Sequence, residues 1–268
     1  VVVDTAWFKG NYPPHVSVEA TSIEGFPTID ELHAATWVPL VEKSEVKGDS
    51  ENPFDVSDPH RYTHVRLTIY PDGGVARFRV HGDPLPDPRL LTGTIDLAGL
   101  ENGGTVIDCS NMFYSSPLNI LRPDRAHNMG DGWENARRRD SGNDHVTVRL
   151  AARGSVRRVE IDTSYFIGNS AGWARLSGID ATTADLDDAS AWREIVPKTK
   201  LQSDTRHLFG SSTSTPVTHV RLDVFPDGGL ARLRINGEID SDTLVELDRA
   251  WRDSLPAVHS TAASVGNL

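Results

Sequence analysis

The densest set of residues that could carry out chemistry is the stretch GDGWENARRRDSGND, which runs from Gly130 to Asp144. It brings carboxylates, amides and three consecutive arginines together. The next segment, His145 to Leu150, alternates between polar and apolar residues, which is typical of a β-strand. One interpretation is a solvated turn whose Asp and Asn side chains cap their own backbone. Trp133 favours a binding role instead, because a large aromatic residue beside a glycine in a loop is costly unless it packs or binds.

A second candidate is a pair of arginines on two alternating segments, Val217 to Phe225 and Leu230 to Ile235. The PDGG sequence between them is a strong hairpin signal, and a turn centred on its Asp-Gly pair places Arg221 directly opposite Arg234. Two opposed cations repel each other, so they need an anion nearby. That anion is either the carboxylate of a substrate, gripped by both arginines, or a carboxylate of an adjacent strand. Two residues could supply the latter: Glu160 and Asp162. A similar pattern of polar side chains recurs around the first PDGG sequence, in the other half of the chain, and this recurrence favours the structural role.

A third candidate is the polar stretch SNMFYSSPLN, from Ser110 to Asn119. Hydroxyl and amide groups at this density can hold a ureido or sugar group through neutral hydrogen bonds, and they also build ordinary turns. Cys109 lies beside Asp108 without the cationic setting that makes a thiol reactive, so a nucleophilic cysteine is not expected.

The chain carries no sequence signature of a built-in metal or nucleotide site. Its ten histidines are scattered, without HxH, HExxH or paired CxxC spacing. There is no GxGxxG or Walker sequence. We expect no cofactor, although Asp, Glu and His side chains leave room for a weakly bound divalent ion.

Composition narrows the class of partner. A net charge of −11 argues against a general affinity for nucleic acid, because phosphate backbones are held by clustered Lys and Arg. A single cysteine excludes an internal disulfide framework and favours a reduced, cytoplasmic compartment. No apolar run approaches the roughly 18 to 20 residues of a membrane helix. We therefore expect a cytoplasmic protein with a small-molecule partner, and neither a membrane nor a nucleic-acid partner.

Short strands must position these candidate residues, because helical periodicity is scarce and alternating segments bounded by Gly, Pro, Asp and Asn recur throughout. An all-β sandwich or jelly roll follows. The Pro- and Asp-rich stretch from Asp83 to Arg89 cannot continue a strand and marks a domain junction. We expect a first domain over residues 1–88, a second over 89–253, and a flexible tail over 254–268.

The two predicted domains repeat one another. The motif DTxxFxGN begins at Asp4 and again at Asp162, THVRL begins at Thr63 and again at Thr218, and a PDGG turn follows each THVRL. This is a duplicated domain rather than a short solenoid repeat. A long segment precedes the second DTxxFxGN motif, whereas only three valines precede the first. We therefore expect the first copy to be incomplete at its N-terminus.

Several longer motifs occur in a fixed order. MGDGWENARRRDSGND followed by VRL, then VEIDTSYFIGN, then THVRLDVFPDGGLARLRING, resemble the second repeat of the allantoicase family. VDTAWFKGN and THVRLTIYPDGGVARFRVHG resemble the back half of its first repeat, and SNMFYSSPLNIL resembles the stretch that opens each repeat. The resemblance covers the chain from Val1 to about Gly237.

The resemblance implies tandem jelly-roll domains, similar to galactose-binding modules, in a homo-oligomer. It implies hydrolysis of allantoate, a small anion with two ureido groups, to ureidoglycolate and urea in purine breakdown. The departing urea nitrogen needs a proton, and three residues could provide acid–base help: Glu134, Asp144 and His145. Arginines for the carboxylate and polar groups for the ureido groups give the expected binding residues: Asn111, Trp133, Arg137, Arg138, Asn143, Arg221 and Arg234.

The chain also departs from the family pattern. Asn135 stands where the family usually has Thr after GWE, and His145 stands where it often has Trp after Asp. If the polypeptide begins at Val1, we predict poor folding of the first domain and little activity.

Two other functions fit parts of the sequence. A non-catalytic β-sandwich module that binds a sugar or ureide would need exposed aromatics and amides more than three consecutive arginines. A structural assembly domain would use the arginine faces as subunit contacts, and Arg234→Ala would then change the oligomeric mass without changing turnover per assembled unit.

Overall fold

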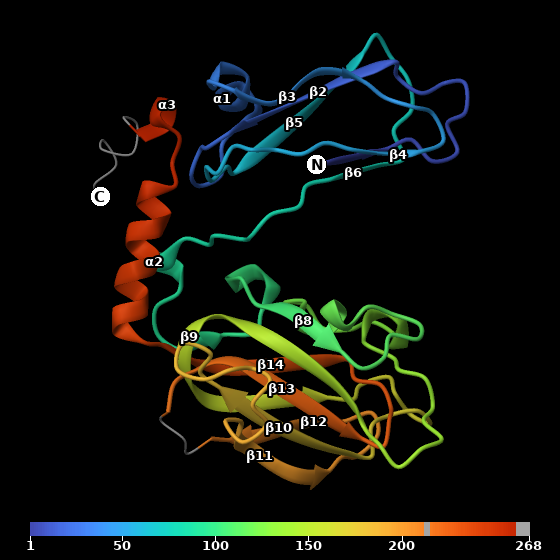
Figure 1. The fold of residues 1–268 in the computed structure, drawn as a ribbon, viewed down its shortest axis with the longest axis vertical. Helices are drawn as coiled ribbons and strands as arrows, with labels where there is room; N and C mark the ends of the chain where they lie inside the picture. Colours follow the sequence, from blue (N-terminus) through green and yellow to red (C-terminus); the bar gives the residue numbers. More distant parts are fainter. Residues whose placement is uncertain (212–214, 261–268) are drawn as a thin grey trace. The chain divides into compact units, whose positions relative to one another are not determined.

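The structure, a computed structural model, describes residues 1–211 and 215–260. Its contacts divide the chain into two compact units (Figure 1). The first comprises Val1–Asp83 together with the described residues from Arg249 onward, and the second comprises Pro84–Asp248. The division falls within the predicted Pro- and Asp-rich junction. Of the predicted flexible tail, residues 254–260 are described with the first unit, and residues 261–268 lie outside the described residues.

The elements of the first unit are mostly short strands: β1 (Val2–Asp4), β2 (His15–Thr21), α1 (Ile29–Ala34), β3 (Val38–Glu45), β4 (Glu51–Pro53), β5 (His64–Tyr70) and β6 (Arg77–Arg79). The second unit begins with η1 (Pro88–Leu90), β7 (Ile95–Asp96), η2 (Leu100–Asn102), β8 (Thr105–Cys109), η3 (Pro117–Leu121) and η4 (Met129–Asp131). It continues with β9 (Asp144–Asp162), β10 (Trp173–Ile179), β11 (Arg193–Lys200), β12 (Arg206–Gly210), β13 (Val217–Phe225) and β14 (Arg232–Ile239). Two helices follow: α2 (Ser241–Asp253) and α3 (Ala257–Ser260).

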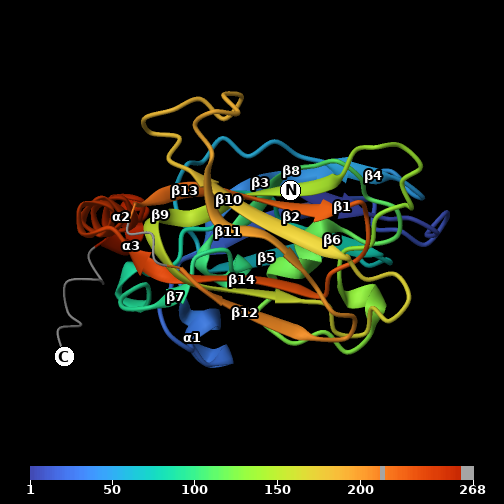
Figure 2. The ribbon, with the colours of Figure 1, turned by 90° about the horizontal axis from the view of Figure 1, so that it is seen from below.

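The long strand β9 organises the second unit, because its 19 residues pair with different strands along their length (Figure 2). Its first half pairs with β13 and β8, and its second half pairs with β14 and β12. The strands follow the order β11-β10-β13-β9-β14-β7, and β8 and β12 also pair with β9. Val148, Ile161 and Leu222 are among the fully buried side chains of the core that these strands enclose. The prediction of an all-β sandwich is confirmed.

The first unit contains counterparts of the later strands of the second. Its two three-stranded sheets have the orders β4-β1-β6 and β3-β2-β5, which match β12-β9-β14 and β11-β10-β13. Val3, Val16 and Val46 form one buried cluster of its core, with partly buried aromatic and aliphatic side chains packed around them. The sequence repeat is therefore also a structural repeat.

The second glycine of each PDGG turn is required by packing. A Cβ on Gly229 would lie 1.9 Å from the Phe166 ring, and a Cβ on Gly74 would lie 1.9 Å from the Phe8 ring. Phe166 and Phe8 are the phenylalanines of the two DTxxFxGN motifs. Each repeat thus closes its turn by packing one motif directly onto the other.

The predicted hairpin between the two arginine-bearing segments is wrong. β13 and β14 do not pair with each other; both pair with β9, which lies between them. Alternation along a strand shows which side chains share a face, but it does not identify the neighbouring strand. Arg221 lies opposite Thr147 of β9, and Arg234 lies opposite Glu160 further along the same strand, so the two arginines are not opposed.

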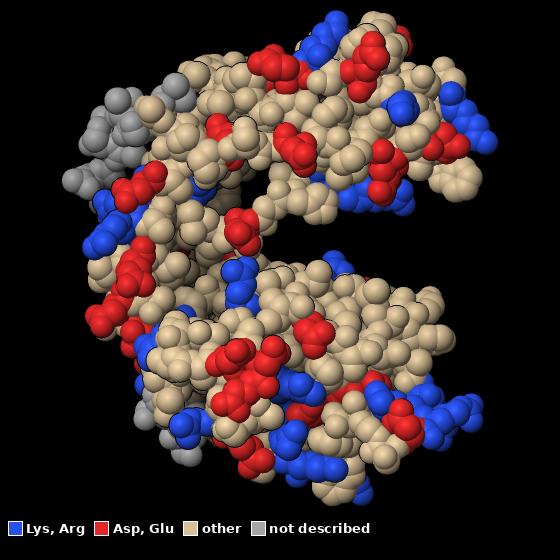
Figure 3. Space-filling view, viewed as in Figure 1, with Lys and Arg blue, Asp and Glu red and all other residues tan. Residues whose placement is uncertain are grey.

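Helix α2 is an element that the sequence analysis did not anticipate. Leu244 and Leu247, three residues apart, pack against the core of the second unit. Among the described residues, no helix is long and apolar enough to cross a membrane. Figure 3 shows acidic and basic side chains interleaved on the visible face of the second unit.

Candidate functional site

The segment that contains Gly-Trp-Glu-Asn is anchored first by Trp133. This side chain is fully buried in the core of the second unit. Its backbone N–H donates to Leu230 O at 2.8 Å, and the Leu230 N–H donates back to Trp133 O at 3.0 Å. The indole Nε1 donates to Asn111 O at 2.9 Å. Trp133 was predicted to bind substrate. It is instead a core residue that holds the segment in place.

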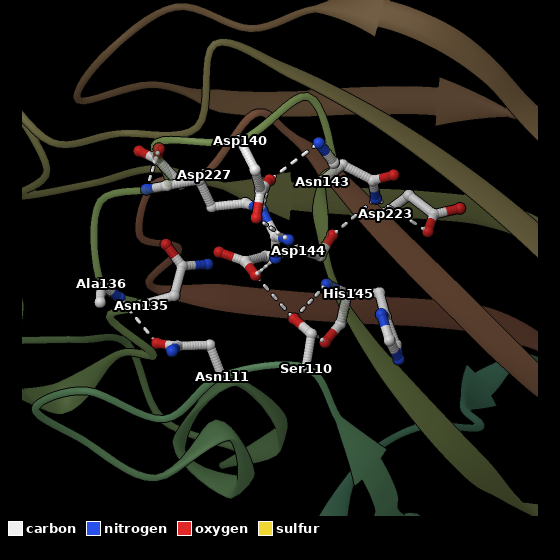
Figure 4. Close-up of polar contacts among 12 residues, drawn as sticks. Ser110, Asn111, Asn135, Ala136, Asp140, Asn143, Asp144, His145, Asp223 and Asp227 are labelled. Carbon is white, nitrogen blue, oxygen red and sulfur yellow. Dashed lines mark hydrogen bonds and ion pairs between the residues drawn. The ribbon is translucent and has the colours of Figure 1, made fainter.

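The residues after Glu134 are pinned to two neighbouring segments. Asn135 is buried, and its side-chain Oδ1 accepts a hydrogen bond from the Gly228 backbone N–H at 2.6 Å. The Ala136 N–H donates to Asn111 Oδ1 at 2.7 Å (Figure 4). The segment is thus tied to the PDGG turn on one side and to the polar SNMFYSSPLN stretch on the other.

Glu134 lies between two buried residues, Trp133 and Asn135, and is itself only half-buried. Its Oε1 accepts a hydrogen bond from Asn169 Nδ2 at 2.7 Å. The second carboxylate oxygen, Oε2, makes no hydrogen bond within the part of the chain that the structure describes. The backbone oxygen of Glu134 accepts from the Phe113 N–H at 3.2 Å. Glu134 is therefore a partly accessible carboxylate on a firmly held backbone.

Asp144 occupies a different environment behind this segment. Its side chain is 1% exposed, and its Oδ1 accepts hydrogen bonds from Arg138 Nη1 at 2.7 Å and from Ser110 Oγ at 2.9 Å. Arg138 also forms two hydrogen bonds with Asp140, at 2.9 and 3.0 Å. Hydrogen bonds to Asp140 and then Asp144 raise the pKa of Arg138, and the Arg138 hydrogen bond lowers the pKa of Asp140. This network closes the arginine-rich loop onto the start of β9.

The buried network leaves two polar atoms without partners. Asp144 Oδ2 and Asn135 Nδ2 are both buried and make no hydrogen bond among the described residues. Figure 4 shows the two side chains facing the same cluster. Because both atoms are inaccessible, this cluster is suited to holding the segment in place rather than to contacting a substrate directly.

His145 lies on the opposite face of β9 from Asp144, as alternation along a strand requires. Its Nε2 is 2.8 Å from Asp108 Oδ2. The three groups predicted to move a proton therefore have three separate surroundings. Glu134 contacts Asn169, Asp144 contacts Arg138, and His145 contacts Asp108.

The other predicted binding residues are spread over the unit. Asn143 Nδ2 donates to Asp223 Oδ1 at 3.2 Å. Asp223, 2% exposed, also binds Arg221 and Arg175. Arg221 thus finds its anion on its own strand rather than in Glu160 or Asp162.

The last two predicted binding residues are Arg234 and Arg137. Arg234 Nη1 lies 3.5 Å from Asp96 Oδ2, and Arg206 rather than Arg234 forms the ion pair with Glu160. Arg137 is exposed and forms no ion pair with any described residue.

Asn169 is a site residue that the sequence analysis did not select. Its motif, DTxxFxGN, was visible only as a repeat, and nothing in the sequence places it next to Glu134. Asn111 accepts a hydrogen bond from Ala136, next to the Gly-Trp-Glu-Asn segment, and Arg138 binds Asp144. Their roles in substrate binding stay predictions.

Among the described residues, no group of three or more His, Cys, Asp or Glu side chains is arranged to hold a metal ion. A weakly bound divalent ion, held by fewer protein ligands, stays a prediction.

Comparisons with known proteins converge on one family. The family model described as "Allantoicase repeat" matches residues 1–85 and 95–240. A protein of Nocardia farcinica named "Probable allantoicase" is 54% identical over 242 residues, which cover 89% of this chain and 71% of that protein. The allantoicase of Dictyostelium discoideum is 42% identical over 244 residues, which cover 87% of this chain and 66% of that protein.

The fold matches as well. A crystal structure of allantoicase from Saccharomyces cerevisiae superimposes with a TM-score of 0.76 at 35% sequence identity. The superposition covers 88% of this chain and 71% of the yeast chain. The jelly-roll resemblance inferred from the motifs is confirmed.

Proposed function

The chain belongs to the allantoicase family, and from this premise we propose that its second repeat carries the residues that hydrolyse allantoate to ureidoglycolate and urea. Family membership makes the chain a hydrolase of allantoate, which is a small-molecule substrate of allantoin degradation. The remaining question is which side chains do the work.

The reaction defines what the site must supply. A C–N bond between the central carbon and one ureido group breaks, and a C–O bond to water forms at the same carbon. The water loses a proton, and the departing urea nitrogen gains one. A single positioned carboxylate can take the first proton and deliver the second, which is the usual division of work in general acid–base catalysis.

We assign this carboxylate to Glu134. One observation supports the choice most strongly: Glu134 is half-buried with Oε2 free, whereas Asp144 is 1% exposed and its own unpartnered oxygen, Oδ2, is buried. The segment around Glu134 is held on both sides by Trp133 and Asn135. A rigid backbone with one free acceptor is what a proton-transfer group requires.

The binding roles follow from the same surroundings. Arg137 is exposed and without an ion pair among the residues that the structure describes, and we assign it to the carboxylate of allantoate. Asn111 uses its Oδ1 on the Ala136 N–H, which leaves its amide nitrogen to donate to a ureido carbonyl. The buried Asp144 and Arg138 network supports these groups from behind.

The test is urea release from allantoate by the chain and by the protein that includes any residues its gene encodes before Val1. Glu134→Gln is expected to lower kcat by about 100-fold or more, the usual contribution of a general acid–base group. Glu194→Gln, at an exposed glutamate of β11, is the matched control and should leave turnover unchanged. Wild-type turnover by Glu134→Gln would refute the assignment. Binding of allantoate without turnover by the folded wild-type protein would favour the non-catalytic module.

We further propose a cytoplasmic homo-oligomer. The single cysteine, Cys109, is free and half-buried, which suits a reduced compartment. Met112, Phe113 and Tyr114 form a consecutive run of exposed apolar side chains, the kind of surface that a subunit contact covers. Light scattering of the purified protein measures the oligomeric mass, and a monomer at assay concentration would refute this part of the proposal.

A further inference from the structure

We propose that Asn169 is a positioning residue of the hydrolytic site, whose side-chain amide orients the Glu134 carboxylate. The inference rests on the proposed role of Glu134. It concerns the DTxxFxGN motif, which the reaction described above does not otherwise use.

The contact is short and directional. Asn169 Nδ2 donates to Glu134 Oε1 at 2.7 Å, and the same nitrogen lies 3.1 Å from Met129 Sδ. An amide nitrogen carries two hydrogens, so it can serve both acceptors at once. With Oε1 occupied, Oε2 is the oxygen left to face water or substrate.

The two repeats separate the backbone role of this asparagine from its side-chain role. Asn169 O accepts a hydrogen bond from the Gly229 N–H at 2.7 Å, and Asn11 O accepts one from the Gly74 N–H at 2.7 Å. This structural contact uses only the backbone, so many side chains could satisfy it. In the second repeat this backbone contact leaves the side-chain amide of Asn169 free to bind Glu134.

The loop that carries Asn169 is fixed on its N-terminal side. Tyr165 has φ 69°, a left-handed conformation that is unusual for a bulky residue, and its N–H donates to Asp204 Oδ1 at 2.7 Å. Phe166 follows and is fully buried against Gly229. A backbone held this firmly presents the Asn169 amide in one orientation, which is what a positioning residue requires.

The experiment compares Asn169→Ala and Asn169→Asp with Asn11→Ala and Asn11→Asp in the 268-residue chain, where Asn11 is exposed, and measures kcat, KM and Tm. Asn169→Ala should lower kcat roughly 10- to 100-fold with KM changed by no more than about twofold, because a mispositioned group impairs the chemical step more than binding. Asn169→Asp places a second carboxylate against Glu134 and should lower kcat at least as much. Both Asn11 variants should keep wild-type kinetics, and Tm should stay within the range of the Asn11 controls.

A double-mutant cycle isolates the contact. Once Glu134→Gln is present, adding Asn169→Ala should reduce kcat no further. Full multiplication of the two losses would overturn the inference, because Asn169 would then act independently of Glu134. A parallel fall in Tm with unchanged kcat would also overturn it, since the role would be structural.

The inference and the proposed function fail in different ways. If Glu134→Gln abolishes turnover while Asn169→Ala retains wild-type kcat, the positioning role is wrong and the assignment of Glu134 stands. If Glu134→Gln keeps wild-type turnover, the assignment of Glu134 is wrong and the positioning role falls with it.

Discussion

Asn135 Oδ1 accepts a hydrogen bond from the Gly228 backbone N–H at 2.6 Å, which joins the Gly-Trp-Glu-Asn segment to the turn between β13 and β14. Asn135 is 6% exposed. The bond therefore satisfies a buried donor in a turn that must also accommodate Phe166 against Gly229. It makes one residue of the candidate site part of the packing of the fold.

Removing this acceptor should destabilise the protein. Asn135→Ala leaves the buried Gly228 N–H unpaired, and we expect the free energy of unfolding to fall by about 1–3 kcal/mol. Ser141→Ala, at an exposed position of the nearby loop, is the control and should change stability little. Urea denaturation of the three proteins measures the difference. Equal unfolding midpoints for Asn135→Ala and the control would show that the turn does not depend on this bond.

Arg232 should stabilise the loop that leads into the candidate site. Its side chain is 2% exposed and donates to Asp124 O and Asp131 O, both at 2.7 Å, and to Asp124 Oδ1 at 2.8 Å. Arg232→Met would leave Asp131 O and Asp124 Oδ1 without this donor, whereas Asp124 O keeps its hydrogen bond from Arg234 Nη2 at 2.9 Å. We expect the free energy of unfolding to fall by about 3 kcal/mol and trypsin to cleave faster after Arg125.

The first repeat supplies the matched control for Arg232. Arg77 occupies the corresponding position, is 59% exposed, and lies 3.7 Å from its partner Asp4. Arg77→Met should therefore have a much smaller effect on unfolding and none on cleavage after Arg125. Equal losses in the two variants would contradict the view that the buried arginine has a specific role in the second repeat.

His219 should make stability fall in mild acid. Burial, and then the charge of Arg149, lower the pKa of His219 below its ordinary value. The unfolded chain takes up a proton as pH falls through about 6.5, while the folded state still resists it. Folding therefore loses stability as pH falls through that value, and the loss levels off below the lowered pKa of the folded state.

His219→Gln removes this titration. Between pH 7.5 and 5.5 we expect the unfolding midpoint of the wild type to fall further than that of the variant. Denaturant titrations at several pH values measure the difference between the two. Parallel pH profiles would exclude His219 as a source of acid sensitivity.

Local and long-range features of this chain differ in how far its sequence predicts them. Alternation around THVRL identified β13, because the pattern depends only on successive side chains. The pairing of β13 with β9 was missed because another strand, distant in sequence, lies between β13 and β14. In the same way, Glu134 was readable as a candidate, but its contact with Asn169 joins residues 35 positions apart in two loops whose meeting depends on the sandwich.

The last prediction concerns the repeated contact between phenylalanine and glycine. A Cβ at Gly229 would lie 1.9 Å from the Phe166 ring, so Gly229→Ala forces the ring or the turn to move. We expect a loss of about 1–3 kcal/mol in the free energy of unfolding, the usual cost of overpacking. Because the Gly229 N–H also binds Asn169 O, the shift should reach the Glu134 contact and lower kcat. Gly74→Ala places the same clash against Phe8 in the first repeat, so its effect on stability should be similar. A larger fall in kcat for Gly229→Ala than for Gly74→Ala, at matched stability loss, would separate the repeat that holds the chemistry from the repeat that only shares its packing.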